Sequence, residues 1–198
     1  MSGVLITAFE AFGGRAGNVS LETLKRLQAE DWGEVELHPR VLPVVRGEAP
    51  SMVESFVREL QPTVVIMLGE AAGRSSITPE RIAVNLDDFE IRDNRGNQPR
   101  NETIVKDGPP HYSSTLPLDA MVHRLQQLGL PAEISDSAGR FVCNHVFYRV
   151  AHYIAQSGGS VSCGFIHLPR CLEQSEQRFS TEDLAEGVKV CIKACLGE

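Results

Sequence analysis

The chain is organised around residues 137–148, which read Ser-Ala-Gly-Arg-Phe-Val-Cys-Asn-His-Val-Phe-Tyr. A turn of small residues leads into an apolar segment, and Cys143 stands where the two meet. From Cys143 onward, Phe147, Val150 and Ile154 recur at helical spacing. The pattern predicts a largely buried helix with Cys143 in or just before its first turn.

A cysteine at the start of a helix can be a nucleophile. Free backbone N–H groups and the positive end of the helix dipole favour a thiolate there. The pKa of such a thiol can fall from about 8.5 into the range of about 3.5–7.5. The alternative is that Cys143 is a buried residue acting as a small hydrophobe. The rest of the chain has to decide between these two interpretations.

Composition indicates a globular protein whose 198 residues suit a single domain spanning residues 1–198. The net charge of −7, with no basic run, argues against nucleic-acid binding. The apolar run 4–9 has no basic segment before it, and Glu10 follows it, so we expect neither a signal peptide nor a membrane span. The five cysteines are an odd number, which favours a reduced cytoplasmic protein over a disulfide scaffold.

The first third of the chain alternates between strand and helix patterns. Apolar runs at 4–8, 35–45 and 63–68 predict strands, the second of them interrupted by prolines. Leucines within 21–27 and apolar residues within 53–60 form helical stripes. The order strand-helix-strand-helix-strand predicts a three-layer α/β/α sandwich around a twisted, mostly parallel sheet.

The remaining elements follow from the same patterns. Apolar stripes within 118–128 and 184–195 predict helices, and the run 161–169 predicts a core strand. Residues 132–135 suggest a short strand. The polar segment 93–108, rich in Asn, Gly and Pro, predicts a long loop or an exposed hairpin.

Two loops follow predicted parallel strands, where ligands bind in open α/β sheets. Residues 9–14 carry two aromatics and a double glycine, and residues 69–74 close the third strand. Neither a dinucleotide-binding nor a Walker A glycine pattern follows the double glycine, which disfavours nucleotide binding. Cys191 and Cys195 have no matching Cys or His pair, so no metal site is expected.

Glu80 is a candidate for an inward-facing carboxylate. In an extended chain it shares one face with Ile82 and Val84. A carboxylate that points into the core needs a partner. The alternative is that Glu80 lies at a solvated strand end.

A helix-start cysteine, a strand-end histidine and an inward carboxylate are the ingredients of a thiol triad. His145 lies about 200° around the helix from Cys143 and should face away. His152 lies more than two turns along the helix. His167 stands at the end of a predicted core strand, at the sheet edge where we expect the helix start. Spacing alone leaves the choice of histidine open.

Five motifs in order give the chain a resemblance to the pyroglutamyl peptidase type I family, the pyrrolidone carboxyl peptidases, over essentially its whole length. Chance agreement of five motifs in sequence is improbable. They are residues 8–14 (AFEAFGG), 77–81 (ITPER) with Asn85, 93–99 (DNRGNQP), 137–145 (SAGRFVCNH) and 164–169 (GFIHLP).

The resemblance implies a cytosolic α/β cysteine peptidase that removes an N-terminal 5-oxoproline from peptides and needs no cofactor or metal. Its substrate would be a peptide or small amide with a blocked N-terminus, and it would assemble as a homotetramer. The family's catalytic residues match Cys143, His167 and Glu80. Its pocket residues match the aromatic rings of Phe9 and Phe12, which would stack on the lactam, and Asn18, Phe141 and Val142.

The chain departs from the family at several positions, two of which change the charge. Glu70, which we expect at the pocket, stands where the family has Gln, and Glu90 where it has an arginine that is thought to help hold the oxyanion. The smaller departures are Val19 for Pro, Ala72 for Gly and Arg92 for Pro. In an extended segment Glu90 and Arg92 share a face, so Arg92 is a candidate for the vacated oxyanion role.

These departures leave alternatives open. The backbone N–H of Cys143 would carry the oxyanion if Arg92 does not. Negative charge from Glu70 and Glu90 at the pocket would oppose thiolate formation. The same triad would otherwise act on a different acyl group, one bearing a cation that pairs with Glu70 or Glu90. The remaining alternative is a binding protein on the same fold, with its oxyanion site disabled by Glu90.

Overall fold

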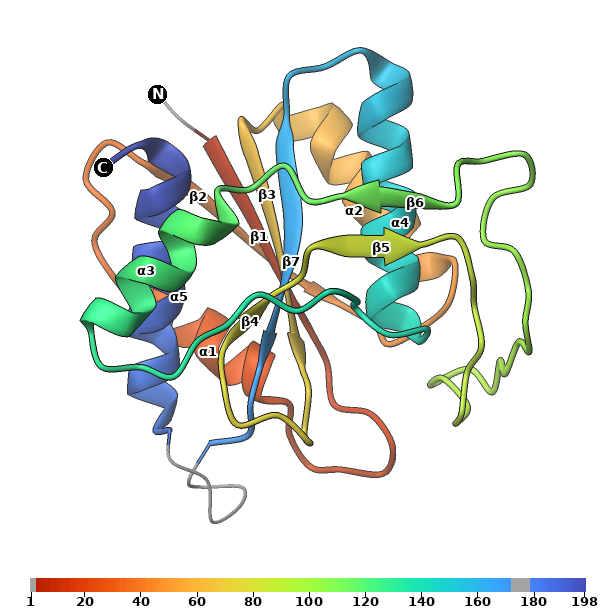
Figure 1. The fold of residues 1–198 in the computed structure, drawn as a ribbon, viewed down its shortest axis with the longest axis horizontal. Coiled ribbons are helices and arrows are strands. Elements are labelled where there is room, and N and C mark those ends of the chain that lie inside the picture. The colour runs from red at the N-terminus through yellow and green to blue at the C-terminus, as the bar shows by residue number, and fades with distance from the viewer. Residues whose placement is uncertain (1–2, 172–178) are drawn as a thin grey trace.

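The structure, a computed structural model, describes residues 3–171 and 179–198. A five-stranded sheet in the order β2-β1-β3-β7-β4 forms its centre (Figure 1). The first four strands of this order are mutually parallel, and β4 runs antiparallel to β7. The strands are β1 (Gly3–Phe9), β2 (Glu36–Leu42), β3 (Val64–Glu70), β4 (Thr78–Pro79) and β7 (Ser162–Leu168).

Helices cover both faces of the sheet. In Figure 1 one group of helices lies to the left of the sheet and another group lies to its right. The first group is α1 (Val19–Gln28), α3 (Leu118–Gln127) and α5 (Thr181–Leu196). The second is α2 (Glu48–Leu60) and α4 (Val142–Ser157), beside a small antiparallel pair of β5 (Ile82–Val84) and β6 (His111–Ser113). The predicted α/β sandwich with a mostly parallel sheet is confirmed.

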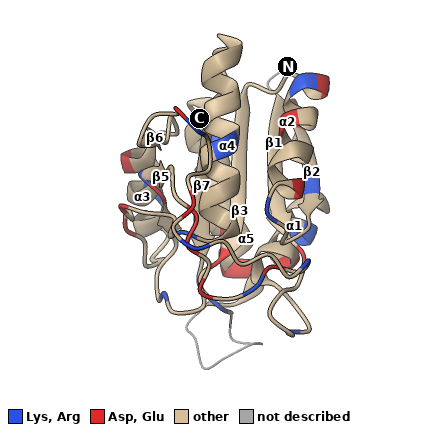
Figure 2. Cartoon of the chain, turned by 90° about the vertical axis from the view of Figure 1, so that its right-hand side faces the viewer, with Lys and Arg blue, Asp and Glu red and all other residues tan. Residues whose placement is uncertain are grey.

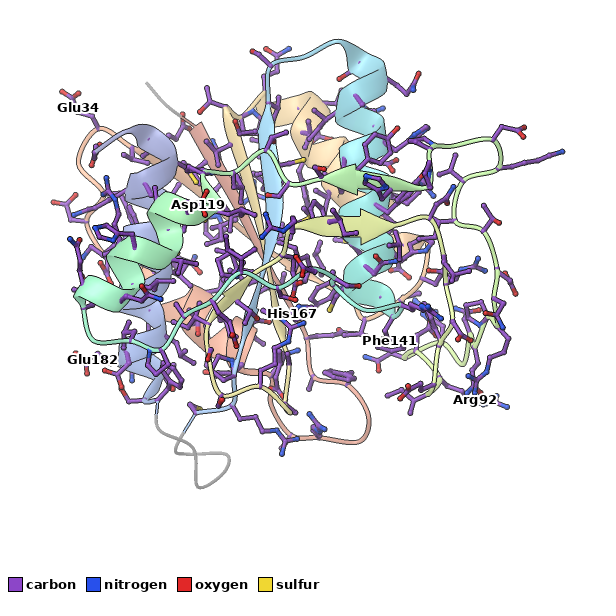
Figure 3. The ribbon with its side chains drawn as sticks, viewed as in Figure 1. Glu34, Arg92, Asp119, Phe141, His167 and Glu182 are labelled. Carbon is purple, nitrogen blue, oxygen red and sulfur yellow. The ribbon has the colours of Figure 1, made fainter. Side chains whose placement is uncertain are left out.

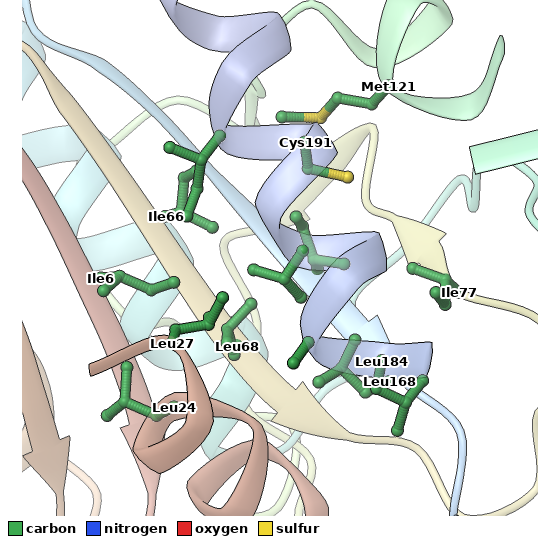
Figure 4. Close-up of a cluster of buried hydrophobic side chains, with 14 of the residues drawn as sticks. Ile6, Leu24, Leu27, Ile66, Leu68, Ile77, Met121, Leu168, Leu184 and Cys191 are labelled. Atoms are coloured by element: carbon green, nitrogen blue, oxygen red, sulfur yellow. The ribbon is translucent and has the colours of Figure 1, made fainter. Parts of the chain in front are cut away.

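The central strands are buried on both faces, which explains their continuous apolar runs. Along β1, Val4 and Ile6 pack under α1 and α5, whereas Leu5 faces α2 and α4. Figure 4 shows Ile6 and Ile66 meeting the side chains of α1 and α5. Full burial of one such side chain stabilises the fold by about 1.5–3 kcal/mol.

Two expected strands differ in detail from the structure. Strand β2 runs through Pro39, because it is an edge strand and a missing N–H there breaks no pairing with a further strand. Residues 132–135 form no strand and make only isolated bridges, Ile77 with Ala132 and Glu80 with Ser135. Residues 93–108 form the predicted long loop.

Parallel strands bring their carboxyl ends to one edge of the sheet, the lower edge in Figure 1. Phe9, Glu70 and His167 lie at or next to the ends of β1, β3 and β7. Cys143 is the second residue of α4. The topology therefore gathers the predicted chemistry at a single edge.

In the cartoon of Figure 2, acidic and basic residues are interspersed along the described part of the chain. Among the described helices, none is both long and apolar enough to cross a membrane.

Candidate active site

A small cavity of about 140 Å³ opens at this edge of the sheet. It is smaller than the roughly 300–1,000 Å³ pockets that hold drug-sized ligands, so it suits one small ring. Cys143 and His167 both line it. The other lining residues are Phe9, Phe12, Asn18, Val44, Glu70, Ala138, Gly139, Arg140, Phe141 and Val142.

His167 and Glu80 form a buried hydrogen-bonded pair. Nδ1 of His167 lies 2.6 Å from Oε1 of Glu80, and both residues are almost inaccessible to solvent. The pairing of β4 with β7 creates this contact, because Glu80 follows β4 directly and its N–H donates to the carbonyl of Phe165. The carboxylate thus points inward, although Ile82 and Val84, which the alternation placed on its face, are only partly buried, whereas Ala83 between them is fully buried.

Cys143 lies in the first turn of α4, with Phe141 as the N-cap residue. The backbone of β3 passes close to its sulfur: a Cβ placed on Gly69 would lie 3.0 Å from Sγ and 2.8 Å from a ring carbon of Phe165. Position 69 must therefore remain glycine for the sulfur to keep its place beside the sheet edge.

Burial raises the pKa of the Cys143 thiol to about 12, and the negative charge of Glu80 adds to the rise. The guanidinium of Arg74 and the backbone N–H of Cys143 act in the opposite direction but do not outweigh the burial. The expectation of a thiolate favoured by the helix start is therefore wrong for the free protein. The thiol is neutral at physiological pH and needs a base.

Aromatic side chains form one wall of the cavity. The ring centroids of Phe12 and Phe141 lie 6.1 Å apart, and Phe89 packs edge-on against Phe141 from behind at 4.7 Å. Phe9 packs against Phe165, with their ring centroids 6.4 Å apart. The structure thus brings the six residues predicted to bind substrate to the same cavity as Cys143 and His167; they are Phe9, Phe12, Asn18, Glu70, Phe141 and Val142.

Four lining residues were not predicted. Ala138, Gly139 and Arg140 belong to the turn that precedes α4, and the motif around Cys143 already contained them. Val44 follows an edge strand and carries no chemical signal in the sequence.

The carboxylate of Glu70 is buried, but its charge is compensated. Oε1 accepts from Nη1 of Arg15 at 2.7 Å and from Nε of Arg170 at 3.3 Å. Oε2 accepts from the backbone N–H of Val19 at 3.0 Å, at the start of α1. Because two guanidinium groups and a helix N-terminus surround it, Glu70 does not present a free negative charge to the pocket.

The structure does not bring Arg92 to this cavity. Its side chain is exposed, and Figure 3 shows it beyond Phe141 as seen from His167. Glu90 is exposed as well and lines a neighbouring cavity together with Asp88 and Arg140. The expectation that these two side chains reach the oxyanion position is not met in this arrangement.

The two histidines of α4, His145 and His152, form hydrogen bonds away from Cys143. His145 is buried and its Nδ1 lies 2.7 Å from Oδ2 of Asp87, which also accepts from Arg46. The ring of His152 pairs with the hydroxyl of Tyr112. Both placements agree with the expectation that they face away from Cys143. In the described ranges no group of three or more Cys, His, Asp or Glu residues could hold a metal ion.

Comparison with known proteins matches the whole chain to one family. The family profile for pyroglutamyl peptidase matches residues 2–197. A pyrrolidone-carboxylate peptidase of Vibrio vulnificus is 45% identical over 200 residues, which cover 99% of this chain and 93% of that protein. A pyrrolidone-carboxylate peptidase of Bacillus cereus is 38% identical over 198 residues, with coverage of 98% and 92%.

Solved structures agree with this match. The crystal structure of pyroglutamyl peptidase I from Bacillus amyloliquefaciens superposes with a TM-score of 0.95 at 35% identity, covering 100% of this chain and 98% of that one. A pyrrolidone carboxyl peptidase from Pyrococcus furiosus gives a TM-score of 0.94 at 39% identity, covering 98% of each chain.

Proposed function

The chain belongs to the pyroglutamyl peptidase family of cysteine peptidases, and we propose that its Cys143, His167 and Glu80 catalyse removal of the N-terminal pyroglutamyl residue from peptides. The observation that carries the proposal is the 2.6 Å contact of Glu80 with His167, whose side chain lines one small cavity together with Cys143.

The proton transfers follow from the hydrogen bond to Glu80. Since Nδ1 of His167 donates to the carboxylate, Nε2 carries the lone pair that accepts the thiol proton. The sulfur then attacks the acyl carbonyl, and Glu80 stabilises the imidazolium that forms. Because the resting thiol is neutral, proton transfer accompanies attack instead of preceding it.

The negative oxygen of the tetrahedral intermediate needs a donor. Cys143 is in the first turn of α4, where backbone N–H groups lack an intrahelical acceptor. Its N–H is the donor we assign to the oxyanion, since Arg92 lies elsewhere. The imidazolium of His167 next protonates the leaving amine, which leaves a thioester on Cys143. Water activated by His167 then hydrolyses the thioester and restores the thiol.

Pocket shape supports a lactam as the acyl group. The rings of Phe9 and Phe12 offer apolar faces to a small planar ring. The side-chain amide of Asn18 has one hydrogen free to donate to a ligand. Its Nδ2 donates the other hydrogen to the carbonyl of Glu10, and among the described residues no second acceptor contacts it. A lactam carbonyl is a fitting acceptor for it.

The alternative acyl group bearing a cation finds less support. It requires a free carboxylate at the pocket, and Glu70 is already paired with Arg15 and Arg170. The alternative of a binding protein without activity rests on Glu90, whose side chain lies outside the cavity that Cys143 and His167 line.

The test is a comparison of fluorogenic pyroglutamyl and prolyl amides as substrates. We expect cleavage of the pyroglutamyl amide alone, abolished by Cys143→Ala and lowered about 10²-fold or more by Glu80→Gln, because the latter removes orientation of the imidazole. Circular dichroism confirms that both variants fold. Equal cleavage of the two amides, or full activity in Cys143→Ala, would overturn the proposal.

We further propose that residues 1–198 act as a single catalytic domain in the cytoplasm. The free thiols of Cys143, Cys163, Cys191 and Cys195 support a reducing compartment. A homotetramer is the assembly that the family resemblance implies, and the exposed Val41, Ile91 and Leu128 are candidate contact residues. Light scattering after size exclusion decides the oligomeric state.

A further inference from the structure

We propose that Arg74 is a positioning residue of this reaction, which holds Glu80 as an ionised partner of His167 and keeps the imidazole neutral at rest. This inference rests on the proposed catalytic roles of His167 and Glu80. Arg74 lies in the loop after β3, which the sequence predicts to face a ligand without giving Arg74 itself a role.

The guanidinium of Arg74 bonds to three separate segments. Nη1 donates to Oε1 of Glu80 at 2.5 Å and also to the hydroxyl of Thr78 in β4. Nη2 donates to the carbonyl of Ser137 at 3.3 Å, in the turn that leads to α4. Arg74 therefore contacts the same carboxylate oxygen that His167 contacts, and it ties that carboxylate to the turn before the nucleophile.

The charge balance explains why a cation is needed. Glu80 is fully buried, and within the described residues its Oε2 has no hydrogen-bond partner. A buried carboxylate without a counter-charge is strongly unfavourable. Among the described residues, the ionisable groups found to interact with Glu80 are Arg74 from the β3–β4 loop, His167 from β7 and, through its charge alone, Cys143 from α4.

Arg74 lets the other two groups stay neutral. With the guanidinium present, the carboxylate has its counter-charge, so His167 and Cys143 can rest as imidazole and thiol. Without it, the uncompensated carboxylate would favour an imidazolium in the free enzyme. An imidazolium has no lone pair to accept the thiol proton, so attack would have to wait for a higher pH.

A merely structural role makes a different prediction. If Arg74 only tied the three segments together, its loss would lower kcat/KM by a similar factor at every pH. An electrostatic role moves the acid limb of the pH profile. The two roles are therefore distinguished by the pH at which the acid limb falls, whereas the size of the loss in kcat/KM at one pH does not distinguish them.

The experiment compares Arg74→Gln and Arg74→Lys with Arg81→Gln as a matched control. Arg81 neighbours Glu80 in sequence, but it is exposed and pairs with Asp136 instead. We expect kcat/KM on a pyroglutamyl amide to fall about tenfold near neutral pH in Arg74→Gln, with a loss that shrinks as pH rises. Arg74→Lys retains the acid limb of the wild type at a lower rate, and Arg81→Gln matches the wild type throughout.

A second readout needs no turnover. In protein carrying ¹⁵N-labelled histidine, the ring signals of His167 report imidazole and imidazolium directly. We expect protonation of His167 at higher pH in Arg74→Gln than in the wild type, and no displacement in Arg81→Gln. If Arg74→Gln does not fold, the test relies on Arg74→Lys, which keeps the positive charge. An acid limb of its pH profile that moves to higher pH than in the wild type would overturn the inference.

The inference would also be overturned if folded Arg74→Gln showed the same acid limb of the pH profile as the wild type and the same pH of His167 protonation. If the wild type does not cleave pyroglutamyl amides, the proposed function fails, whereas the histidine titration still tests the link between Arg74, Glu80 and His167.

Discussion

Cys143 is the residue for which the structure departs most from the sequence-based expectation, which was a thiolate with a lowered pKa. Burial raises its pKa to about 12, so the free enzyme holds a neutral thiol at this position. We predict that alkylation of Cys143 by iodoacetamide accelerates steadily between about pH 6 and about pH 10. Peptide mapping should find Cys143 labelled before the buried Cys163 and Cys191, since only Cys143 among these three lines the cavity. A rate plateau that begins below neutral pH would indicate a preformed ion pair and contradict this account.

Glu70 gives a second prediction at the residue scale. Its carboxylate holds Arg15, whose guanidinium lies 5.4 Å from the ring centre of Phe12. We predict that Glu70→Gln raises KM several-fold, because Arg15 loses the partner that holds it against a pocket ring. It should also lower the free energy of unfolding by about 1.5–3 kcal/mol, the contribution of a hydrogen bond to a charged group.

The matched control for this substitution is Glu34→Gln, because Glu34 is exposed and lies far from the cavity (Figure 3). It should leave both KM and stability unchanged. An improvement of kcat/KM in Glu70→Gln would instead mean that the negative charge of Glu70 reaches the pocket despite its two arginine partners.

The sequence predicts the role of a residue when the signal is local, and it misses contacts between residues that are far apart in the chain. Cys143, His167 and Glu80 were each recognised from a local pattern or motif. The charge of Glu70 was misjudged because its partners, Arg15 and Arg170, lie 55 and 100 residues away. No local pattern shows which distant side chain compensates a carboxylate.

At the scale of elements, Asp93 organises the start of the long loop. Its carboxylate accepts from the backbone N–H groups of Arg46, Arg95 and Asn97 and from the Asn97 side chain. Burial acts to raise the pKa of Asp93, but the hydrogen bonds together outweigh it and lower the pKa. The stability from this ionised carboxylate is therefore present above the unfolded pKa and lost as pH falls through the lower folded value.

We accordingly predict that Asp93→Asn lowers the free energy of unfolding by about 1.5–3 kcal/mol at neutral pH. The difference from the wild type should shrink toward zero as pH falls below about 4. Asp107→Asn, at an exposed position of the same loop, is the control and should be neutral. A deficit in Asp93→Asn that stays constant down to low pH would show that the charge of Asp93 contributes nothing.

Long elements with clear periodicity were predictable, and short ones were not. The stripes of α1, α2 and α5 and the apolar runs of β1, β3 and β7 are local properties of the chain. Strand β4 has two residues and exists because it pairs with β7, which lies far along the sequence. Residues 132–135 read as a strand in isolation, yet the segment meets its neighbours only at single bridges.

At the scale of the whole molecule, the parallel sheet assembles the site. Phe9, Glu70 and His167 come from three strands that are adjacent in space, and α4 delivers Cys143 to the same edge. The order of strands and helices sufficed to predict this convergence, because carboxyl ends of parallel strands share an edge. The exact partners within the site, such as Arg74 on Glu80, depend on loop geometry that periodicity does not describe.

The central claim is that Cys143 receives the pyroglutamyl group in a cavity built for a lactam. The most direct measurement is mass spectrometry of the intact enzyme, quenched in acid during turnover of a reactive pyroglutamyl ester, followed by peptide mapping. We predict an adduct of one pyroglutamyl group on Cys143, absent in Cys143→Ala and absent when an acetyl-prolyl ester replaces the substrate. An adduct on any other residue, or turnover of the ester by Cys143→Ala at the rate of the wild type, would contradict the account.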